Sequence, residues 1–386
     1  MDLFKKKDNK VPFISPAIGS HEFRNIKKSL ESTWLVYGEF AKQLEETLRE
    51  KLEVEDVLLT GSCTSALLLS LKLANIGPGD EVITTPISWV ATSNVIIECG
   101  ATPIFCDVNP ITGLLNEDII ESHISSRTKA IMTVDLYGQM SNMQKLREIC
   151  NKYGLILIED SAHSLEAERE GFKPGQLSDF AALSFHAAKN YTSGQGGALI
   201  VQNKEHGNLG RIMRRDGVVN LPNGTRRMVE FGGKHDGTDF QAAMILPQLK
   251  NSESILAKRQ EVFTNYIEAT RKLGIESPQI VKESKSAFHL FVVWLDPLIR
   301  DRVRELMFQD GISTSIHYDP IHLEPYYKRK FGFELGAFPA SEKIGFGTVS
   351  LPTYPQLNYK KQKLVINSME RAITKANLEI KDKNAN

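Results

Sequence analysis

The chain has 386 residues, 41% of them hydrophobic, enough to bury the core of a globular protein of about two domains. Its 47 basic and 47 acidic residues give a formal net charge of zero, which excludes a broad electrostatic attraction to nucleic acid or to an anionic membrane. No run of about 18 apolar residues is present, so the sequence offers no candidate membrane span.

The N-terminus and the cysteines fit a protein of the cytoplasm. A basic cluster at Lys5–Lys7 is followed by no apolar stretch, so we interpret it as a solvated end and not as a signal peptide. The four cysteines are too few and too scattered for a disulfide scaffold in a chain of this size. We therefore expect a soluble protein in a reducing compartment.

From about residue 55 onward, short apolar runs alternate with amphipathic stretches. The runs are apolar on both faces, as in a buried and mainly parallel sheet, and predict strands at 56–60, 81–85, 103–108, 129–134, 155–160, 180–185 and 198–202. Helical patterns between them cover 65–74, 91–99 and 142–154. This alternation predicts an α/β fold, a three-layer α/β/α domain with helices on both faces of the sheet.

The character of the chain changes after about residue 238. Residues 239–274 carry one helical apolar stripe, interrupted at Pro247, which predicts a long kinked or broken connecting helix. Beyond it the strand-like runs are fewer, at 288–295 and 313–318, and residues 381–386 are expected to form a frayed polar tail. We expect a large domain over 12–245, with the connecting helix and a smaller C-terminal α/β domain over 246–386. The N-terminal segment could pack with the smaller domain.

Polar residues with complementary chemistry follow several of these strands. Thr64 and Ser65 open the helix after the first strand, and the unpaired N–H groups of a helix N-terminus suit a phosphate. Either hydroxyl could instead act simply as an N-cap. Trp89 follows the second strand and could stack on a flat ring, although a lone tryptophan more often packs in a core.

Asp160 and His163 follow the strand at 155–160. Ligand-binding groups in open α/β sheets gather at the carboxyl ends of strands. A carboxylate there can keep a pyridine nitrogen protonated, and His163 could hydrogen-bond the phenolic oxygen of such a ring. The alternative is a carboxylate that caps the next turn, with His163 packed beside it.

Lys189 lies between two buried-looking strands, after Ser184 and His186 and before glycines at 194, 196 and 197. Lysine forms a reversible imine with an aldehyde when desolvation lowers its pKa, and nearby glycines let the backbone approach a ligand. A loop lysine is otherwise a solvated surface charge. The residues around Lys189 are compatible both with an imine-forming lysine and with a solvated surface charge.

Six ordered stretches resemble motifs of the DegT/StrS-type sugar aminotransferases. They are GSCTSALLLSL, TTPISWVAT, LILIEDSAHS, SFHAAKNYTSGQGGA, TDFQAA and HYDPIHLEPYY, and the similarity runs from about Pro12 to about residue 375. The resemblance implies a fold type I, aspartate aminotransferase-like architecture whose large domain binds pyridoxal 5′-phosphate (PLP). It also implies a homodimer with shared active sites.

The same resemblance assigns roles to individual residues. Lys189 matches the catalytic lysine that holds the cofactor as an imine, and Asp160 matches the partner of the pyridine nitrogen. The remaining cofactor contacts would be Thr64, Ser65, Trp89, His163 and Ser184. The sugar pocket would be lined by His186, His317, Tyr318 and His322. A metal at the last two histidines is disfavoured because they are five residues apart with Pro320 between them.

Two departures from the family's pattern bear on the site. Gln195 stands where the family usually has a glutamate after the lysine. The stretch 232–236 lacks the asparagine that in the family reaches the cofactor phosphate of the neighbouring subunit. Lys234 could replace it as a point charge, whereas Asp236 would repel a phosphate and should point elsewhere.

The expected reaction is a ping-pong transfer of an amino group from an amino acid, glutamate by resemblance, to a nucleotide-linked keto sugar. SFHAAKN and WVAT resemble most the branch that aminates C4 of UDP-linked 4-keto sugars for surface polysaccharide or glycan synthesis. A C3 aminotransferase acting on a dTDP-keto sugar remains open. Lys189 speaks against a sugar dehydratase of the same fold, in which a histidine replaces the lysine. Intact Lys189 and Asp160 also speak against a non-catalytic regulatory homologue, which Gln195 and Asp236 would favour.

Overall fold

The computed structural model describes residues 10–385, so the basic cluster at Lys5–Lys7 lies outside the described residues. Helices α1 (Ser20–Glu31) and α2 (Glu39–Leu52) lead into a sheet with the strand order β1-β8-β7-β5-β4-β2-β3. Its strands are β1 (Asp56–Thr60), β2 (Glu81–Thr84), β3 (Thr102–Phe105), β4 (Thr128–Val134), β5 (Ile156–Asp160), β7 (Phe180–Ser184) and β8 (Gly197–Val201). Every strand predicted between residues 56 and 202 forms. All run in one direction except β8, which lies antiparallel between β1 and β7.

Alternation along the strands explains the three layers. In β5, Ile158 packs into a core with helices α3 (Cys63–Leu73) and α4 (Ala91–Glu98), whereas Leu157 packs into a second core with α5 (Met143–Tyr153). In β7, Ala182 packs into the core with α3 and α4, whereas Ala181 points to the opposite face and is covered by α2. Because successive strand side chains point to opposite faces, these runs must be apolar throughout, and the predicted α/β/α layering is confirmed.

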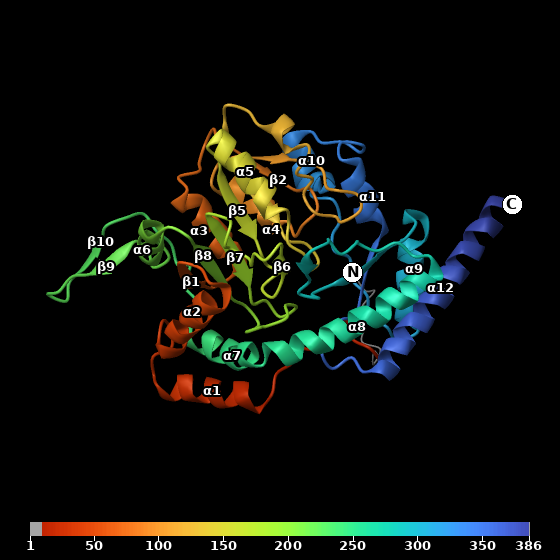
Figure 1. The fold of residues 1–386 in the computed structure, drawn as a ribbon, viewed down its shortest axis with the longest axis horizontal. Coiled ribbons are helices and arrows are strands. Elements are labelled where there is room, and N and C mark those ends of the chain that lie inside the picture. Colours follow the sequence, from red (N-terminus) through yellow and green to blue (C-terminus); the bar gives the residue numbers. More distant parts are fainter. Residues whose placement is uncertain (1–9, 386) are drawn as a thin grey trace.

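The predicted connecting helix is broken, but not at its proline. Helix α7 (Asp239–Lys250) contains Pro247, and the break falls at Asn251, before α8 (Ser252–Leu273). Side chains on both sides of the proline, including Ala243 and Leu249, pack into the same core, and their burial holds this turn helical despite the missing hydrogen bond. Figure 1 shows α7 beneath the sheet and α8 leading from it to the C-terminal part of the chain.

The C-terminal part has its own core. Strands β12 (Phe291–Trp294) and β13 (Thr348–Leu351) pair antiparallel and pack with α9 (Pro297–Gln309) and α12 (Tyr359–Ala385). Val11 joins this core and bridges to Ile312, so the N-terminal segment returns to this part of the molecule. The shorter elements here are η2 (Ile321–Leu323), α10 (Pro325–Phe331) and α11 (Pro339–Gly347). A domain boundary at residues 245–246 remains our proposal.

Two C-terminal predictions are wrong. Residues 313–318 form no strand; only Ser315 bridges to Ser350, and the carbonyl of His317 accepts from the side-chain hydroxyls of Tyr137 and Thr348 and not from a backbone N–H. The expected polar tail continues α12 as far as Ala385. Its two lysines and its alanine are good helix formers, which favours this continuation of the helix.

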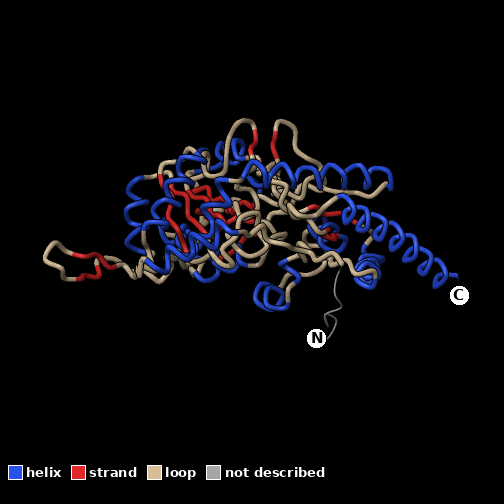
Figure 2. Tube along the Cα trace, turned by 90° about the horizontal axis from the view of Figure 1, so that it is seen from below, coloured by secondary structure: helices blue, strands red, loops and turns tan. Residues whose placement is uncertain are grey.

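Smaller elements complete the described chain: η1 (Ile120–His123), β6 (Glu168–Arg169), α6 (Lys204–Met213), β9 (Val218–Asn220), β10 (Arg226–Met228) and β11 (Ser284–Lys285). Strands β9 and β10 form a hairpin that stands away from the body at the end opposite to α12, as Figures 1 and 2 show. Within residues 10–385, none of the helices has the length and apolar character needed to span a membrane.

Candidate active site

A cavity of about 490 Å³ lies where the chain leaves β1, β2, β5 and β7 and meets the segments 289–290 and 315–318. The sequence predicted that ligand-binding groups gather at these strand ends. Of the candidate residues, the cavity is lined by Thr64, Trp89, Asp160, His163, Ser184, His186, Lys189, His317 and Tyr318, together with Gln195. Residues separated by up to about 250 positions in the sequence therefore meet at one site.

Lys189 sits in the turn after β7, with its backbone N–H donating to the carbonyl of His186 at 2.9 Å. Burial lowers the pKa of its side chain from 10.5 to about 8, and the charge of Asp160 opposes this shift. Within the described residues it has no ion-pair partner. An amine with a pKa near 8 is partly neutral at neutral pH, and only a neutral amine is a nucleophile or a base.

Asp160 ends β5 and is buried. Its Oδ2 accepts from the Thr92 hydroxyl at 2.7 Å, and its Oδ1 accepts from the backbone N–H of Ala162 at 3.2 Å. Burial raises the pKa of the carboxyl, and the bond from Thr92 is the strongest opposing influence. No cation of the described chain pairs with it, so this buried carboxylate has an unused capacity for a positive partner in the cavity.

His163 has a defined tautomer. Its Nδ1 accepts from the backbone N–H of Tyr137 at 3.3 Å, so the proton of the neutral ring is on Nε2, which lies 3.1 Å from the hydroxyl of Tyr318. Burial lowers the pKa of His163 well below its ordinary value, so the ring is neutral. The expected hydrogen bond from His163 to the phenolic oxygen of the cofactor ring stays a prediction, because in this structure Nε2 faces the hydroxyl of Tyr318.

The start of α3 has unpaired N–H groups facing the region of the cavity, as an anion site requires, but the predicted role of Ser65 changes. Ser62 is the N-cap, and its hydroxyl oxygen accepts from the N–H of Ser65 at 3.0 Å. The side chain of Ser65 lies 3.0 Å from that of Ser62 and does not line the cavity. The N–H groups of Cys63 and Thr64, in the first turn, have no intrahelical acceptor and suit a phosphate. Sequence reasoning missed Ser62, although an N-cap serine is a readable signal.

Gly197 explains how β8 can pass this turn. A Cβ at this position would lie 2.4 Å from the backbone nitrogen of Cys63 and from the carbonyl carbon of Ser62. No side chain fits there, so the glycine-rich stretch after Lys189 serves close packing of β8 on the start of α3. The sequence predicted that the backbone approaches a ligand at these glycines, whereas the close neighbours of Gly197 are backbone atoms of Ser62 and Cys63.

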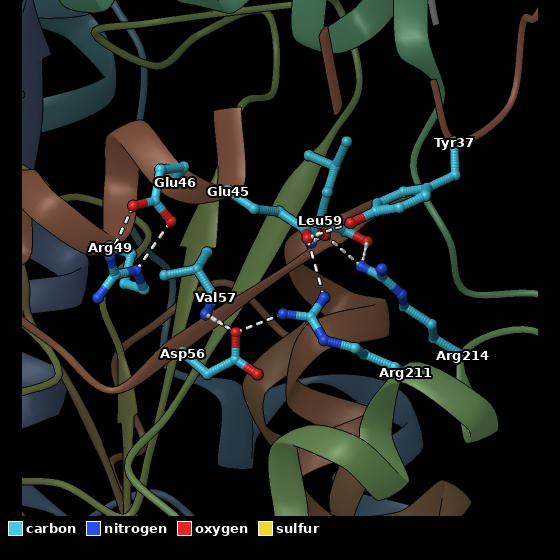
Figure 3. A network of polar contacts seen from close by, with 9 residues as sticks. All are labelled: Tyr37, Glu45, Glu46, Arg49, Asp56, Val57, Leu59, Arg211 and Arg214. Carbon is cyan, nitrogen blue, oxygen red and sulfur yellow. Dashed lines mark hydrogen bonds and ion pairs between the residues drawn. The ribbon is translucent and has the colours of Figure 1, made fainter. Parts of the chain in front are cut away.

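A buried network of ion pairs contacts β1 at Leu59, close to the turn that leads into α3 (Figure 3). Arg214 is 2% exposed and donates to Oε1 of Glu45 at 2.6 Å and to the carbonyl of Leu59 at 2.8 Å. The carbonyl of Arg214 accepts the N–H groups of His235 and Asp236. The network therefore joins the end of β1 to residues 232–236, the stretch that departs from the family's pattern.

Lys234 lies outside the cavity within one chain. Its ammonium group is 3.2 Å from Oδ1 of Asp236, whose side chain is 2% exposed, while that of Lys234 is 66% exposed. Asp236 is thus paired and turned inward. A contact from Lys234 to the cofactor of a neighbouring subunit stays a prediction.

His322 does not line the cavity, contrary to expectation. It is completely buried in η2, and its Nε2 lies 2.9 Å from Oε1 of Glu342, which also accepts the N–H of Gly336. The ring of Phe338 packs edge-on against it, with the centroids 4.7 Å apart. The pairing with a buried carboxylate fixes the imidazole away from the sugar pocket.

His289 is a cavity residue that sequence reasoning missed. Its Nδ1 lies 3.0 Å from Oδ1 of Asn190, and its ring centroid is 4.4 Å from that of His163. Buried Arg259 in α8 donates to its backbone carbonyl at 3.1 Å. The available signal was a histidine directly before the apolar run that forms β12, where a polar residue is a candidate for a site.

Three features of this cavity define the group that it could hold. The N–H groups at the start of α3 favour an anion such as a phosphate, and Asp160 favours a cationic ring nitrogen. Lys189 favours a carbonyl carbon with which an amine can condense. A phosphorylated pyridine aldehyde carries all three groups, so the residues present fit PLP.

Comparisons with known proteins agree with this chemistry. A model of the DegT/DnrJ/EryC1/StrS aminotransferase family matches residues 16–370. The Bacillus subtilis spore coat polysaccharide biosynthesis protein SpsC is 32% identical over 92% of this chain and 95% of its own length. The PLP-form of Spr1654 from Streptococcus pneumoniae superposes with a TM-score of 0.91 at 26% identity, over 95% of this chain and 99% of that one. Helicobacter pylori PseC, an aminotransferase involved in pseudoaminic acid biosynthesis, gives 0.89 at 27% identity over 94% and 99%.

Proposed function

We propose, since this chain belongs to the DegT/DnrJ/EryC1/StrS aminotransferase family, that it transfers an amino group from an amino acid to a nucleotide-linked keto sugar. The chain is an aminotransferase with the fold of the PLP-dependent enzymes, and PLP is its cofactor. The observation that carries the proposal is the meeting of Lys189, with its lowered pKa, and the unpaired buried Asp160 in one cavity.

PLP, when bound, supplies an aldehyde carbon that accepts an amine and a ring that withdraws electrons from it. We assign Lys189 to the aldehyde and Asp160 to the ring nitrogen. Thr64, Ser184 and the N–H groups at the start of α3 are assigned to the phosphate, and Trp89 to the face of the ring. Trp89 is 62% exposed, so its indole is free to cover a ring that enters the cavity.

The residues of the chain perform the proton transfers. Once the amine of the donor has displaced Lys189, the freed lysine acts as a general base and takes the proton from the α-carbon of the donor. As a general acid it would then deliver that proton to the former aldehyde carbon of the cofactor, and the same steps would run in reverse with the keto sugar. A pKa near 8 suits both roles near neutral pH. Asp160, ionised and desolvated, stabilises positive charge on the ring nitrogen throughout.

We propose glutamate as the donor and C4 of a UDP-linked 4-keto sugar as the acceptor, for surface polysaccharide or glycan synthesis. The resemblance of SFHAAKN and WVAT to the C4 branch supports this acceptor, and the similarity to SpsC, a spore coat polysaccharide biosynthesis protein, supports the role in surface polysaccharide synthesis. The cavity size is within the range of small-molecule sites, and His186, His317 and Tyr318 offer hydrogen bonds to sugar hydroxyls. A dTDP-linked 3-keto sugar is the competing acceptor.

A homodimer is part of the proposal. Large apolar side chains are exposed on α1 and around the β9–β10 hairpin, among them Phe23, Trp34, Met228, Val229 and Phe231, which are 56–67% exposed. Exposed apolar groups of this number favour burial against another protein surface.

We further propose that the enzyme works in the cytoplasm, where its four free cysteines stay reduced.

The test uses the purified PLP-loaded protein in two steps. Glutamate alone should convert the visible absorbance band of the bound cofactor into that of its aminated form, with release of the keto acid. A panel of UDP- and dTDP-linked keto sugars should then restore the original band with one acceptor, and mass spectrometry identifies the aminated carbon. Absence of any spectral change with glutamate or with other amino acids contradicts the proposed function.

A further inference from the structure

Two buried hydroxyl groups form a chain that ends on Asp160. The hydroxyl oxygen of Thr92, which is 1% exposed, lies 2.7 Å from Oδ2 of Asp160. The hydroxyl oxygen of Ser88, which is 3% exposed, lies 2.6 Å from that of Thr92. Both residues come from the turn that carries Trp89 and opens α4, so a segment distant in sequence from β5 contacts the carboxylate.

The direction of this chain follows from counting hydrogens. Thr92 has one hydroxyl hydrogen and three possible acceptors: the carboxylate of Asp160 at 2.7 Å, the hydroxyl of Ser88 at 2.6 Å and the carbonyl of Trp89 at 3.2 Å. The carboxylate cannot donate and is the only charged acceptor of the three, so Thr92 donates to Asp160. Ser88 can then donate to Thr92 at 2.6 Å in preference to the carbonyl of Trp89 at 3.0 Å. Each bond polarises the next, which strengthens the donation to the carboxylate.

The two oxygens of Asp160 are held unequally. Oδ2 receives the short bond from Thr92, whereas Oδ1 has only the N–H of Ala162 at 3.2 Å and the thiol of Cys63 at 3.8 Å. Oδ1 therefore keeps the greater capacity for a further donor. Of the influences that keep this buried carboxyl ionised, the Thr92 bond is the largest, ahead of the charge of Lys189.

We propose that Thr92, supported by Ser88, is a positioning residue for Asp160. It keeps the carboxyl ionised and turns Oδ1 toward the cationic nitrogen that the cavity accepts. This inference rests on the proposed function, which assigns Asp160 to the ring nitrogen of the cofactor. Thr92 borders the cavity, and in this role its hydroxyl acts through Asp160.

The experiment compares Thr92→Val with Thr92→Ser in the PLP-loaded protein. Valine keeps the shape of threonine and removes the hydroxyl, whereas serine keeps the hydroxyl and removes a methyl group. Three readouts are measured: the pH titration of the visible absorbance of the bound cofactor, the dissociation constant of PLP from fluorescence quenching, and the single-turnover rate with glutamate against the KM for glutamate.

Thr92→Val should lower the single-turnover rate by about 10- to 100-fold, the effect expected for a lost hydrogen bond to a buried charge, while KM changes less than about threefold. It should also weaken PLP binding and displace the absorbance titration. Thr92→Ser should stay within about threefold of the wild type in every readout. Ser88→Ala, which shortens the chain by one donor, should give an intermediate loss.

Wild-type behaviour of Thr92→Val in all three readouts overturns the inference. An equal loss in Thr92→Val and Thr92→Ser also overturns it, because packing of the methyl group and not the hydroxyl would then be responsible. These outcomes are distinct from failure of the proposed function, in which the wild type itself does not react with glutamate. In that case the absorbance titration and the PLP dissociation constant still decide whether Thr92 acts on Asp160.

Discussion

At the residue scale, the reactivity of Lys189 comes from groups that are remote in sequence. Buried histidines surround it, and burial lowers the pKa of His163 and His289 well below the ordinary range and that of His317 to about 3. These neutral rings give the amine no counter-ion. Asp160 is the carboxylate whose charge opposes the desolvation of Lys189. The site therefore holds a lysine that can lose its proton near neutral pH.

Removal of the lysine tests its role directly. Lys189→Ala should reduce turnover by at least about 1000-fold, because no other group in the cavity combines imine formation with proton transfer. Cofactor should still bind without a covalent bond, through the start of α3 and Asp160. Absorbance spectroscopy and borohydride trapping measure both effects. Substantial turnover in this variant would contradict the assignment.

The pH dependence of cofactor capture tests the lowered pKa. The neutral amine reacts, so the capture rate in the apoprotein should rise about tenfold per pH unit below pH 8 and level off above it. A lysine with the ordinary pKa of 10.5 would continue to rise up to that value. Stopped-flow absorbance between pH 6 and about 11 distinguishes the two profiles, and a continued rise beyond pH 10 would refute the lowered pKa.

Local chemistry made much of the site predictable from the sequence. A carboxylate or lysine at the end of a buried strand is readable, because strand ends converge in a parallel sheet. Thr92 and His289 were not readable, since their function depends on side-chain contacts made across 68 and 99 positions, to Asp160 and Asn190. The resemblance assigned His322 to the pocket. Its pairing with Glu342 was not readable from the sequence, because it depends on where a short 3₁₀ turn places the ring.

At the element scale, the contact between β8 and the start of α3 sets the phosphate turn. Gly197→Ala places a Cβ 2.4 Å from backbone atoms of Ser62 and Cys63, so strand and helix must separate. PLP affinity, measured by fluorescence, should fall by more than about tenfold while the lysine is intact.

Gly77→Ala is the matched control for this substitution. Its new Cβ would have the carbonyl of Cys99 as its nearest neighbour, at an ordinary 3.8 Å. It should bind PLP like the wild type. Equal PLP affinity in the two alanine variants would mean that the turn tolerates the separation.

The elements themselves were predictable wherever burial alone fixed them. The strands of the large sheet are apolar on both faces, and their pattern has no competing interpretation. The break at Asn251 and the irregular 313–318 segment were not, because packing against other elements decided both. Periodicity within one segment contains no information about its partners.

At the scale of the whole molecule, Arg214 links three parts of the chain that are distant in sequence. Arg214→Met should lower the free energy of unfolding by about 2–4 kcal/mol, because it removes the buried partner of Glu45 and leaves the carbonyl of Leu59 without its donor. Arg211 still pairs with Glu45, so the loss is smaller than for an isolated ion pair. Urea unfolding followed by circular dichroism measures it.

Arg49→Met is the comparison within the same region, also drawn in Figure 3. Arg49 pairs with Glu46 on the surface, with side chains 43% and 53% exposed, so this substitution should cost far less stability than Arg214→Met. Equal destabilisation by the two substitutions would show that burial of Arg214 contributes nothing.

The exposed hairpin region predicts the oligomeric state. Replacing Met228 and Phe231 together by aspartate should convert the proposed dimer into a monomer in sedimentation velocity, because both side chains are more than half exposed and apolar in the single chain. The turnover rate should fall with the dimer if the active sites are shared. A wild-type protein that sediments as a monomer contradicts this prediction.

The cavity takes its residues from two distant stretches of the gene. Groups assigned to the cofactor come from residues 62–189, whereas Ser315, Ile316, His317 and Tyr318 come from the C-terminal part. We propose that this C-terminal segment contacts the acceptor, so substitutions at 315 and 316 should change which acceptor is recognised while the groups assigned to the cofactor stay intact. Such a division would let duplicated copies of the gene acquire new sugar preferences in few mutational steps, and it would give library design a short, well-defined target.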